Sequence, residues 1–314
     1  MDLDHDYSRE IRLRNTVIKH TNFVNITERM EECHDFTKKT GTSTYLLILG
    51  EPGVGKSTLL RNYEARHPRS GNGRVISVPV LSVEIPPSPS LVSLVNAFLA
   101  AYGEVYVQRS RKNVGDMTKQ LITLMKAAGT VVILLDELQN FMTQANQTQV
   151  RALAAWLKTL MNQLSIALIA AGVPESQRLV NADDQLRSRM SAEMWIKPFD
   201  IDDQEGFDVF RKILFSIEKN IGFPSPSELY NNPLAERLYF ACDGRLRPLI
   251  SLLSYAIRMV EKRGDDCITV DVLYEAFLQT FKSDTPDRDN PFSNTFIARR
   301  LVGLGEAHGP RVTA

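Results

Sequence analysis

The stretch "LLILGEPGVGKSTLL", residues 46–60, decides how the chain around it folds. Gly50, Gly55, Lys56 and Ser57 match the pattern G-x-x-x-x-G-K-[ST], and a run of apolar residues comes directly before them. Glycines let the backbone turn so tightly that successive N–H groups face phosphate oxygens, and a following helix adds the positive end of its dipole. The stretch therefore predicts a buried strand, a phosphate-binding loop and a helix.

The loop predicts contacts to a nucleotide and to a magnesium ion. We expect the Lys56 ammonium to reach the β- and γ-phosphates and the Ser57 hydroxyl to ligate magnesium. The residues of the loop that we expect to bind the nucleotide are Gly50, Glu51, Pro52, Gly53, Val54, Gly55, Lys56, Ser57 and Thr58.

A second motif, "VVILLDE" at residues 131–137, is expected to complete this site. Its five apolar residues place Asp136 at the carboxyl end of a buried strand, where parallel sheets present their ligands. Asp136 can hold the magnesium through water, and Glu137 can orient and deprotonate an attacking water. An isolated Asp-Glu pair is more often a solvated turn, but the apolar run and the upstream loop favour the catalytic interpretation.

Between Thr44 and Phe199, short apolar runs alternate with segments of helical period, which indicates an α/β fold with a parallel sheet of five strands. The expected strands are "TYLLIL", "RVISVPV", "VVILLD", "IALIAA" and "MWIKPF". Beyond about residue 200 only helical periods remain. We expect an N-terminal lead and first helix at 1–40, an α/β phosphate-loop domain at 41–200, a helical lid domain at 201–282 and a tail at 283–314.

The tail is polar and broken by proline and glycine, so we expect it to be a flexible peptide that binds a partner. The alternative is a disordered end without a role.

Composition limits the possible functions. Lys+Arg and Asp+Glu both number 37, so binding to a polyanion would need a local basic patch. The three cysteines form no CxxC motif and no Cys/His cluster, which argues against zinc and disulfides and fits a reducing cytoplasm. No apolar run approaches the ~18 residues that span a bilayer, and the first ten residues hold no apolar signal segment, so we expect no membrane association and no export.

With these motifs, residues 20–282 resemble the AAA+ ATPases, a likeness that implies ATP and Mg²⁺ as cofactors. In that family a Gly-x-x-Arg motif of the lid sends an arginine to the nucleotide, and "CDGRLRPLISLL" offers Gly244 and Arg247 at that spacing. An arginine finger before the last strand acts on the nucleotide of a neighbouring subunit, so that hydrolysis depends on assembly. Here Arg187 and Arg189 stand in that place, and either could be the finger or an ordinary surface charge.

One position departs from the family. AAA+ proteins usually end the fourth strand with Asn or Thr, which helps to position the water, whereas "IALIAAGVPES" offers Ala170, Ala171, Gly172 and Val173. We therefore expect ATP hydrolysis to be slow, while nucleotide binding is unaffected.

A closer likeness is to the TniB and TnsC group, the AAA+ regulators of bacterial DNA transposition. The chain is similar to this group in "LILGEPGVGKSTLLRNYEARHP", "LLDELQNF" and "AAGVPES" followed by "DDQLRSRM". The resemblance implies a cytoplasmic, ATP-dependent switch that forms a homo-oligomer, a ring or a helical filament, on double-stranded DNA. It further implies that the switch connects a target-selection protein to the transposase.

Such a protein needs a basic surface, and "VYVQRSRKNVGDMTKQL" at residues 105–121 supplies Arg109, Arg111, Lys112 and Lys119. Contacts from these residues to DNA phosphates would carry no sequence preference and would weaken steeply with salt. The alternative for this segment is a solvated charged loop.

Two other functions share the nucleotide motifs: a replication initiator or helicase loader, and a nucleotide-gated signalling ATPase. Both normally carry a further domain, whereas only about thirty residues follow the expected lid.

Overall fold

The computed structural model describes residues 7–71, 76–87, 90–103, 113–142, 146–281 and 285–310. These residues form two compact units. The first comprises Thr21–Lys197, and the second comprises Met1–His20 together with Pro198–Ala314. The expected lead at 1–40 is divided, because its first helix belongs to the second unit and its second helix to the first.

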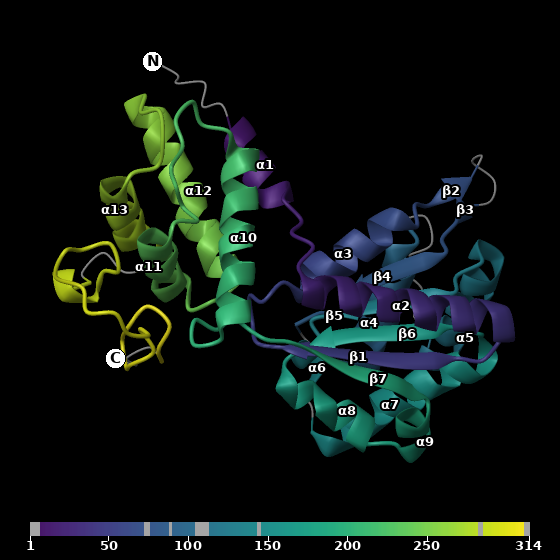
Figure 1. The fold of residues 1–314 in the computed structure, drawn as a ribbon. Helices are drawn as coiled ribbons and strands as arrows, with labels where there is room; N and C mark the ends of the chain where they lie inside the picture. The colour runs from purple at the N-terminus through teal and green to yellow at the C-terminus, as the bar shows by residue number, and fades with distance from the viewer. Residues whose placement is uncertain are drawn as a thin grey trace. The chain divides into compact units, whose positions relative to one another are not determined.

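The Thr21–Lys197 unit contains a five-stranded sheet in the order β4-β5-β6-β1-β7 (Figure 1). All neighbouring strands run parallel, which confirms the predicted α/β class. The strands are β1 (Thr44–Gly50), β4 (Val80–Glu84), β5 (Val132–Asp136), β6 (Ala167–Gly172) and β7 (Met190–Ile196).

Two strands lie partly elsewhere than predicted. "MWIKPF", residues 194–199, overlaps β7 only at 194–196, because β7 begins at Met190 and ends at Ile196. "RVISVPV" was expected to be a single strand, but β3 (Ile76–Ser77) pairs antiparallel with β2 (Ser70–Gly71), and β4 begins only at Val80. Pro79 separates the two pieces because it has no N–H to donate to a ladder. Its carbonyl oxygen still accepts hydrogen bonds from the N–H groups of Val131 and Val132, each at 3.0 Å, and β4 then follows β5 in register.

Helices cover both faces of this sheet. In Figure 1, α2 and α3 lie side by side over one face, where both contact strands of the sheet. On the other face, α4, α5 and α7 share one apolar core with β1, β4, β5 and β6. The helices of this unit are α2 (Thr21–Thr40), α3 (Lys56–Arg66), α4 (Leu91–Ala101), α5 (Val114–Ala128), α6 (Gln139–Met142), α7 (Gln147–Gln163), α8 (Gln177–Asn181) and α9 (Asp184–Ser188), with a 3-10 turn, η2 (Pro174–Ser176).

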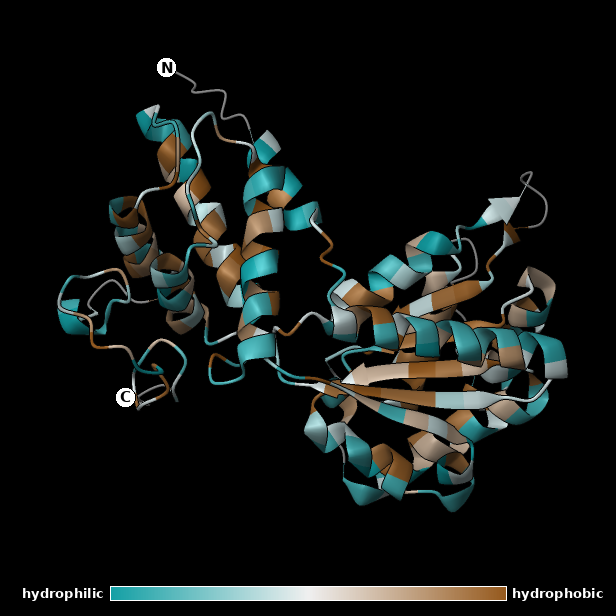
Figure 2. Ribbon diagram, in the orientation of Figure 1, coloured by the Kyte–Doolittle hydropathy of each residue, from teal (hydrophilic) through white to brown (hydrophobic). Residues whose placement is uncertain are grey.

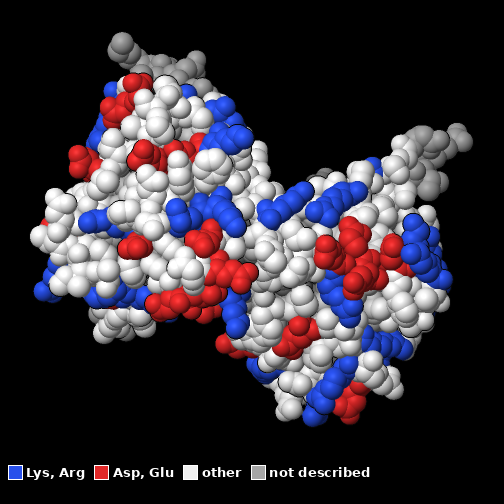
Figure 3. All heavy atoms as spheres, viewed as in Figure 1, with Lys and Arg blue, Asp and Glu red and all other residues white. Residues whose placement is uncertain are grey.

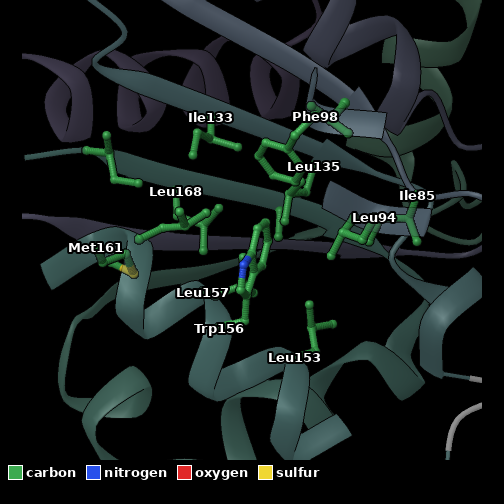
Figure 4. Close-up of a cluster of buried hydrophobic side chains, with 14 of the residues drawn as sticks. Ile85, Leu94, Phe98, Ile133, Leu135, Leu153, Trp156, Leu157, Met161 and Leu168 are labelled. Atoms are coloured by element: carbon green, nitrogen blue, oxygen red, sulfur yellow. The ribbon is translucent and has the colours of Figure 1, made fainter. Parts of the chain in front are cut away.

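Trp156 of α7 lies within that core, as its place beside the apolar stripe of the helix predicts (Figure 4). Its ring meets Phe98 edge to face at 5.2 Å between centroids. The indole N–H donates a 3.0 Å hydrogen bond to the hydroxyl of Thr118, so no polar atom of this buried side chain lacks a partner. Burial of aliphatic and aromatic side chains of this size is the main stabilising contribution to the unit.

The second unit is helical. It consists of α1 (Ser8–Asn15), α10 (Gln204–Ile221), α11 (Asn232–Cys242), α12 (Leu246–Arg263) and α13 (Val270–Thr280), with a 3-10 turn, η3 (Asp287–Asp289). Figure 2 shows apolar residues alternating with polar ones along α10 and α12, as expected of helices that each bury one face. Those apolar residues form a second core, separate from the core around the sheet.

The tail differs from the flexible peptide expected at 283–314, because residues 285–310 pack on the helical unit. Leu301 and Phe292 are almost fully buried in its core. Arg300 forms a two-point contact with the buried carboxylate of Asp243, with Nε and Nη2 at 2.6 and 2.9 Å from its oxygens. These buried contacts are single residues scattered through a polar segment, so they leave no period in the sequence that would have revealed them.

We expect the variant Arg300→Ala to loosen this segment and to lower the stability of the helical unit by about 1–3 kcal/mol, because among the described residues Asp243 would keep an ion pair with Arg245 alone. Thermal unfolding measures the loss, and chymotrypsin cleavage near Phe296 reports the release of the segment. The control is Arg288→Ala, since the Arg288 side chain is 81% exposed. Equal behaviour of the two variants would show that the ion pair with Asp243 does not hold the segment.

Candidate functional site

The phosphate loop joins the end of β1 to the start of α3. Gly50 is the last residue of β1 and Lys56 is the first of α3, so the turn occupies residues 51–55. Gly53 and Gly55 have φ angles of 86° and 107°. Residues with a Cβ rarely adopt such angles, so glycine is required at both positions for the loop to close in this way.

Gly50 is required for a different reason, which is space. A Cβ built on Gly50 would lie 2.4 Å from the carbonyl oxygen of Ile196 and 2.9 Å from Cγ2 of Val54. The end of β7 therefore lies directly against Gly50, the last residue of β1, and a larger residue there would push the two backbones apart.

Lys56 lies across the loop. Its side chain is almost fully buried, and its Nζ donates hydrogen bonds to the carbonyl oxygens of Gly50 at 2.7 Å and Glu51 at 2.9 Å. A buried ammonium needs such acceptors, and the oxygens of a bound phosphate are stronger ones. The loop thus combines a tight turn, closed by two glycines of positive φ, with a positive charge held against it, as a phosphate cradle requires.

Asp136 and Glu137 lie at the same edge of the sheet as the loop, because β1, β5 and β6 run parallel. Only β6 separates β5 from β1, so the two motifs are about 10 Å apart, or two strand spacings. This span fits the terminal phosphates of a nucleotide and a metal ion. An oxygen of Asp136 accepts a 2.8 Å hydrogen bond from the backbone N–H of Glu137.

Glu137 has an unusual backbone. Its φ angle is 58°, in the left-handed region that glutamate seldom adopts and that stores strain of order 1–3 kcal/mol. Such strained positions concentrate at functional sites. The conformation directs the chain from β5 into α6, and the N–H of Leu138 then binds the carbonyl of Ala171 on β6 at 3.0 Å.

Gln139 is a site residue that the sequence analysis did not identify. Its side-chain amide donates a hydrogen bond to a carboxylate oxygen of Glu137. The next residue fixes the turn, because the Asn140 side chain donates to the carbonyl of Ile85 at 2.9 Å. The sequence does hold a signal for this contact, since Gln139 and Asn140 follow "LLDEL". A side-chain amide two residues after a carboxylate can donate a hydrogen bond to that carboxylate.

The end of β6 carries no polar side chain, in agreement with the departure noted in the sequence. Gly172 is its last residue, and a Cβ there would lie 2.2 Å from Oγ of Ser176 and 3.0 Å from Cβ of Leu138. The strand end is therefore closed by η2 and by Leu138, and the structure leaves no space for the asparagine or threonine usual in AAA+ proteins.

We expect Gly172→Ala to lower the free energy of unfolding of the α/β unit by about 1–3 kcal/mol through this overlap. Thermal unfolding measures the effect. Gly115→Ala is the control, because the nearest atom to its new Cβ is a side-chain oxygen of Asn113 at 3.2 Å. An unchanged melting temperature for Gly172→Ala would mean that the strand end is open after all.

Arg187 and Arg189 lie at the opposite edge of the sheet from the phosphate loop. The carbonyl of Arg189 accepts a hydrogen bond from Tyr45 at the start of β1, and β1 then runs seven residues, about 20 Å, to the loop. An arginine side chain cannot cover that distance, so neither residue reaches the loop of its own chain.

The two arginines differ in their surroundings. Arg189 lines a pocket of about 330 Å³, donates from Nη2 to Asn162 at 2.6 Å, and keeps Nη1 buried without a hydrogen-bond partner among the described residues. Arg187 is more open: its side chain is 52% exposed, with Asp184 at 3.8 Å and Asn181 at 3.2 Å.

The third predicted arginine, Arg247, lies in the helical unit. It is the second residue of α12, and Pro248 follows it in the first turn, where a missing N–H costs no hydrogen bond. Gly244, just before the helix, has a φ of 65°, and a Cβ there would lie 2.2 Å from the carbonyl oxygen of Phe199.

Of the four residues expected to bind DNA, Arg109, Arg111 and Lys112 lie outside the described residues. Lys119 is on α5, exposed, and 4.0 Å from Asp116. On the face seen in Figure 3, Lys and Arg side chains lie scattered among Asp and Glu, in keeping with the balanced charge of the sequence.

Among the helices that the structure describes, none is both long enough and apolar enough to cross a membrane.

Comparison with known proteins gave a family and several similar folds. The model of the family described as "Bacterial TniB protein" matches residues 10–197, more than half of the chain. A comparison with curated proteins found no significant match.

Solved structures share the fold at low sequence identity. The Cdc6p structure from Pyrobaculum aerophilum has a TM-score of 0.65 at 14% identity. The match covers 91% of this chain and 76% of the Cdc6p chain. Two Aeropyrum pernix structures, ORC2 in ADPNP-ADP complexes and ORC1 in complex with DNA, both have TM-scores of 0.63. The ORC2 match has 15% identity and covers 88% of this chain and 75% of the ORC2 chain. The ORC1 match has 18% identity and covers 87% of this chain and 69% of the ORC1 chain. These likenesses confirm the AAA+ fold that the sequence predicts.

Proposed function

Because this chain belongs to the family of bacterial TniB proteins and has the AAA+ ATPase fold, we propose that it is an ATP-dependent regulator of DNA transposition. Bound to ATP, it forms a ring or helical filament of identical subunits on double-stranded DNA and connects a target-selection protein to the transposase. Hydrolysis of ATP then returns it to the disassembled state. The observation that carries this proposal is the Lys56 loop at the same sheet edge as Asp136 and Glu137.

The residues at this edge of the sheet are proposed to have separate roles in ATP binding and hydrolysis. The backbone amides of the loop and the Lys56 ammonium bind the β- and γ-phosphates of ATP, and Ser57 and Asp136 are the expected ligands of magnesium. Magnesium, when bound, neutralises charge on the phosphates. Glu137 orients the attacking water and accepts its proton.

Gln139 restrains Glu137 by donating a hydrogen bond to its carboxylate. Together with the missing polar side chain at Gly172, this contact supports slow turnover and long-lived assemblies.

The arginine finger acts between subunits. Arg187 and Arg189 are both too far from the loop of their own chain, so a finger from this edge has to serve a neighbouring copy. Arg187 fits that role better because its side chain is 52% exposed, whereas Arg189 is held by Asn162. Arg247, from the helical unit, is proposed as the lid arginine that contacts the nucleotide.

DNA binding is proposed to be weak for one subunit and tight for many. The net charge of zero gives no long-range attraction to a polyanion, so affinity has to come from the sum of local contacts along an oligomer. The structural likeness to ORC1, which was solved in complex with DNA, is in keeping with such contacts.

We expect the triple variant Arg109→Ala, Arg111→Ala and Lys112→Ala to weaken DNA binding about 10- to 100-fold at moderate salt, without changing nucleotide affinity. Each lost phosphate contact should lower the salt slope of binding by about 0.9. Filter binding over a range of salt concentrations measures both quantities. A matched triple, Arg151→Ala, Lys126→Ala and Lys262→Ala, removes the same charge from exposed positions elsewhere. If both triples shift the curve equally, residues 109–112 are a solvated charged loop.

Negative-stain electron microscopy tests the proposed assembly. The purified protein is imaged with duplex DNA and ATP, and with each ligand alone. We expect rings or helices only when both are present. Particles that remain single subunits in all conditions would contradict the proposal, and oligomers that need ATP but ignore DNA would favour a nucleotide-gated signalling ATPase.

A further inference from the structure

At the end of α3 opposite the phosphate loop, two histidines and a glutamate converge. Glu31 and His34 are three residues apart on α2, so they share one face of that helix. His67 is the residue that ends α3, and Tyr63 lies four residues before it on the same face. Because α2 and α3 pack side by side (Figure 1), these four side chains meet between the two helices.

The contacts within this cluster are short. Nε2 of His67 lies 3.5 Å from a carboxylate oxygen of Glu31. Nδ1 of His34 is 3.0 Å from the hydroxyl of Tyr63, and that hydroxyl donates to the other oxygen of Glu31 at 3.2 Å. The two imidazole rings are 4.9 Å apart between centroids.

We propose that Glu31, His34 and His67 form a binding site for a divalent transition-metal ion such as Zn²⁺. One nitrogen of each histidine and one oxygen of Glu31 all lie within 4.8 Å of one another. Ligand atoms around tetrahedral zinc are about 3.3 Å apart, so small side-chain rotations bring the three into position. Two imidazoles with one carboxylate favour zinc and its neighbours in the first transition row over Mg²⁺ or Ca²⁺.

The surroundings of the cluster support a metal ligand set. Nε2 of His67 is buried and forms no hydrogen bond with the residues that the structure describes, so its contact with the Glu31 carboxylate at 3.5 Å is electrostatic. His34 is also buried, and its Nδ1 lies 3.0 Å from the Tyr63 hydroxyl, which fixes the orientation of its ring. Tyr63 holds the Glu31 carboxylate in place, as outer hydrogen-bond donors do for metal ligands.

Charges near the cluster are mixed. Nη1 of Arg66 lies 3.8 Å from Glu31, and Lys38 and Asp35 of α2 also act on His34. A bound ion would have to displace the attraction between Arg66 and Glu31, which is a long, partly exposed pair and therefore weak. The ion would then tie α2 to the end of α3, the helix whose first residue is Lys56. Since α3 is about 16 Å long, this site is distinct from the proposed magnesium site.

The sequence holds no zinc motif that contains cysteine, but zinc also binds sets of histidine and carboxylate side chains. His34 and His67 lie far apart in the chain and on different helices, so the cluster exists only after α2 and α3 have packed.

Calorimetric titration of the tag-free, chelator-treated protein with ZnCl₂, without nucleotide, tests the site. We expect one Zn²⁺ per chain, a melting temperature raised by the ion, and a visible absorption band of coordinated cobalt when CoCl₂ replaces zinc. His67→Gln is the main variant because this residue ends its helix and lies outside the main core; it should weaken zinc binding about 100-fold or more. Glu31→Gln should act similarly while keeping the shape of the side chain.

The controls are His20→Gln and His308→Gln, two histidines of the other unit, and both should bind zinc as the unchanged protein does. The proposal is overturned if the unchanged protein binds no zinc, or if His67→Gln and Glu31→Gln, folded by circular dichroism, bind it with undiminished affinity. This readout is independent of ATP, so its failure leaves the proposed function untouched.

Discussion

Lys56→Ala is expected to lower the affinity for ATP at least about 100-fold and to abolish assembly on DNA. The Lys56 ammonium is the one charged side chain of the loop that lies across its backbone, bound to the carbonyls of Gly50 and Glu51. Two charge-assisted hydrogen bonds to phosphate oxygens contribute about 3 kcal/mol or more, and about 1.4 kcal/mol corresponds to a factor of ten in affinity. Calorimetry with ATP and magnesium measures the affinity, and electron microscopy with DNA measures the assembly.

The control is Lys126→Ala, an exposed lysine in the last turn of α5. It should bind ATP as the unchanged protein does. Filaments of Lys56→Ala that form normally with ATP and DNA would contradict the assignment of the loop, provided that circular dichroism shows the variant to be folded.

Glu137→Gln is expected to slow ATP hydrolysis about 100- to 10,000-fold while ATP binding is kept, which is the usual contribution of a general base. The substitution preserves the length of the side chain and its place after Asp136, so the cradle and the magnesium ligands stay intact. Oligomers formed with ATP should therefore persist. Phosphate release measures turnover, and the lifetime of the DNA-bound assembly measures trapping.

Glu28→Gln, at an exposed position of α2, is the matched control and should hydrolyse ATP at the unchanged rate. If Glu137→Gln also turns over normally, Glu137 is not the base, and its strained backbone has another cause.

The sequence predicts most of the fold because local patterns carry it. The strand, the loop and the helix around Lys56 are encoded within fifteen residues, and the apolar run before Asp136 specifies a strand buried on both faces. The start of β4 was predicted too early because "RVISVPV" reads as one continuous strand, whereas in the structure Pro79 divides it into β3 and β4. The packing of residues 285–310 was missed because it rests on isolated contacts such as Arg300 with Asp243.

The sequence predicts the residues of the candidate site that belong to motifs, but not the contacts that these residues make. Sequence spacing identifies Lys56, Asp136 and Glu137, but the bond from Gln139 to Glu137 depends on a φ angle of 58° that no pattern specifies. The distance between Arg187 and the loop follows from strand direction and register, which appear only once β7 has paired with β1. The cluster of Glu31, His34 and His67 requires the packing of two helices. The features that were missed therefore all depend on contacts between residues that local sequence does not bring together.

The loop between β1 and α3 is proposed to bind a nucleoside triphosphate. Isothermal titration of the purified protein with ATP and magnesium tests this proposal most directly. We predict a single site per chain, saturable in the micromolar range and lost in Lys56→Ala. A titration that yields no binding heat at several temperatures, with ATP retention on a filter also absent, would contradict the claim and with it the proposed assembly on DNA.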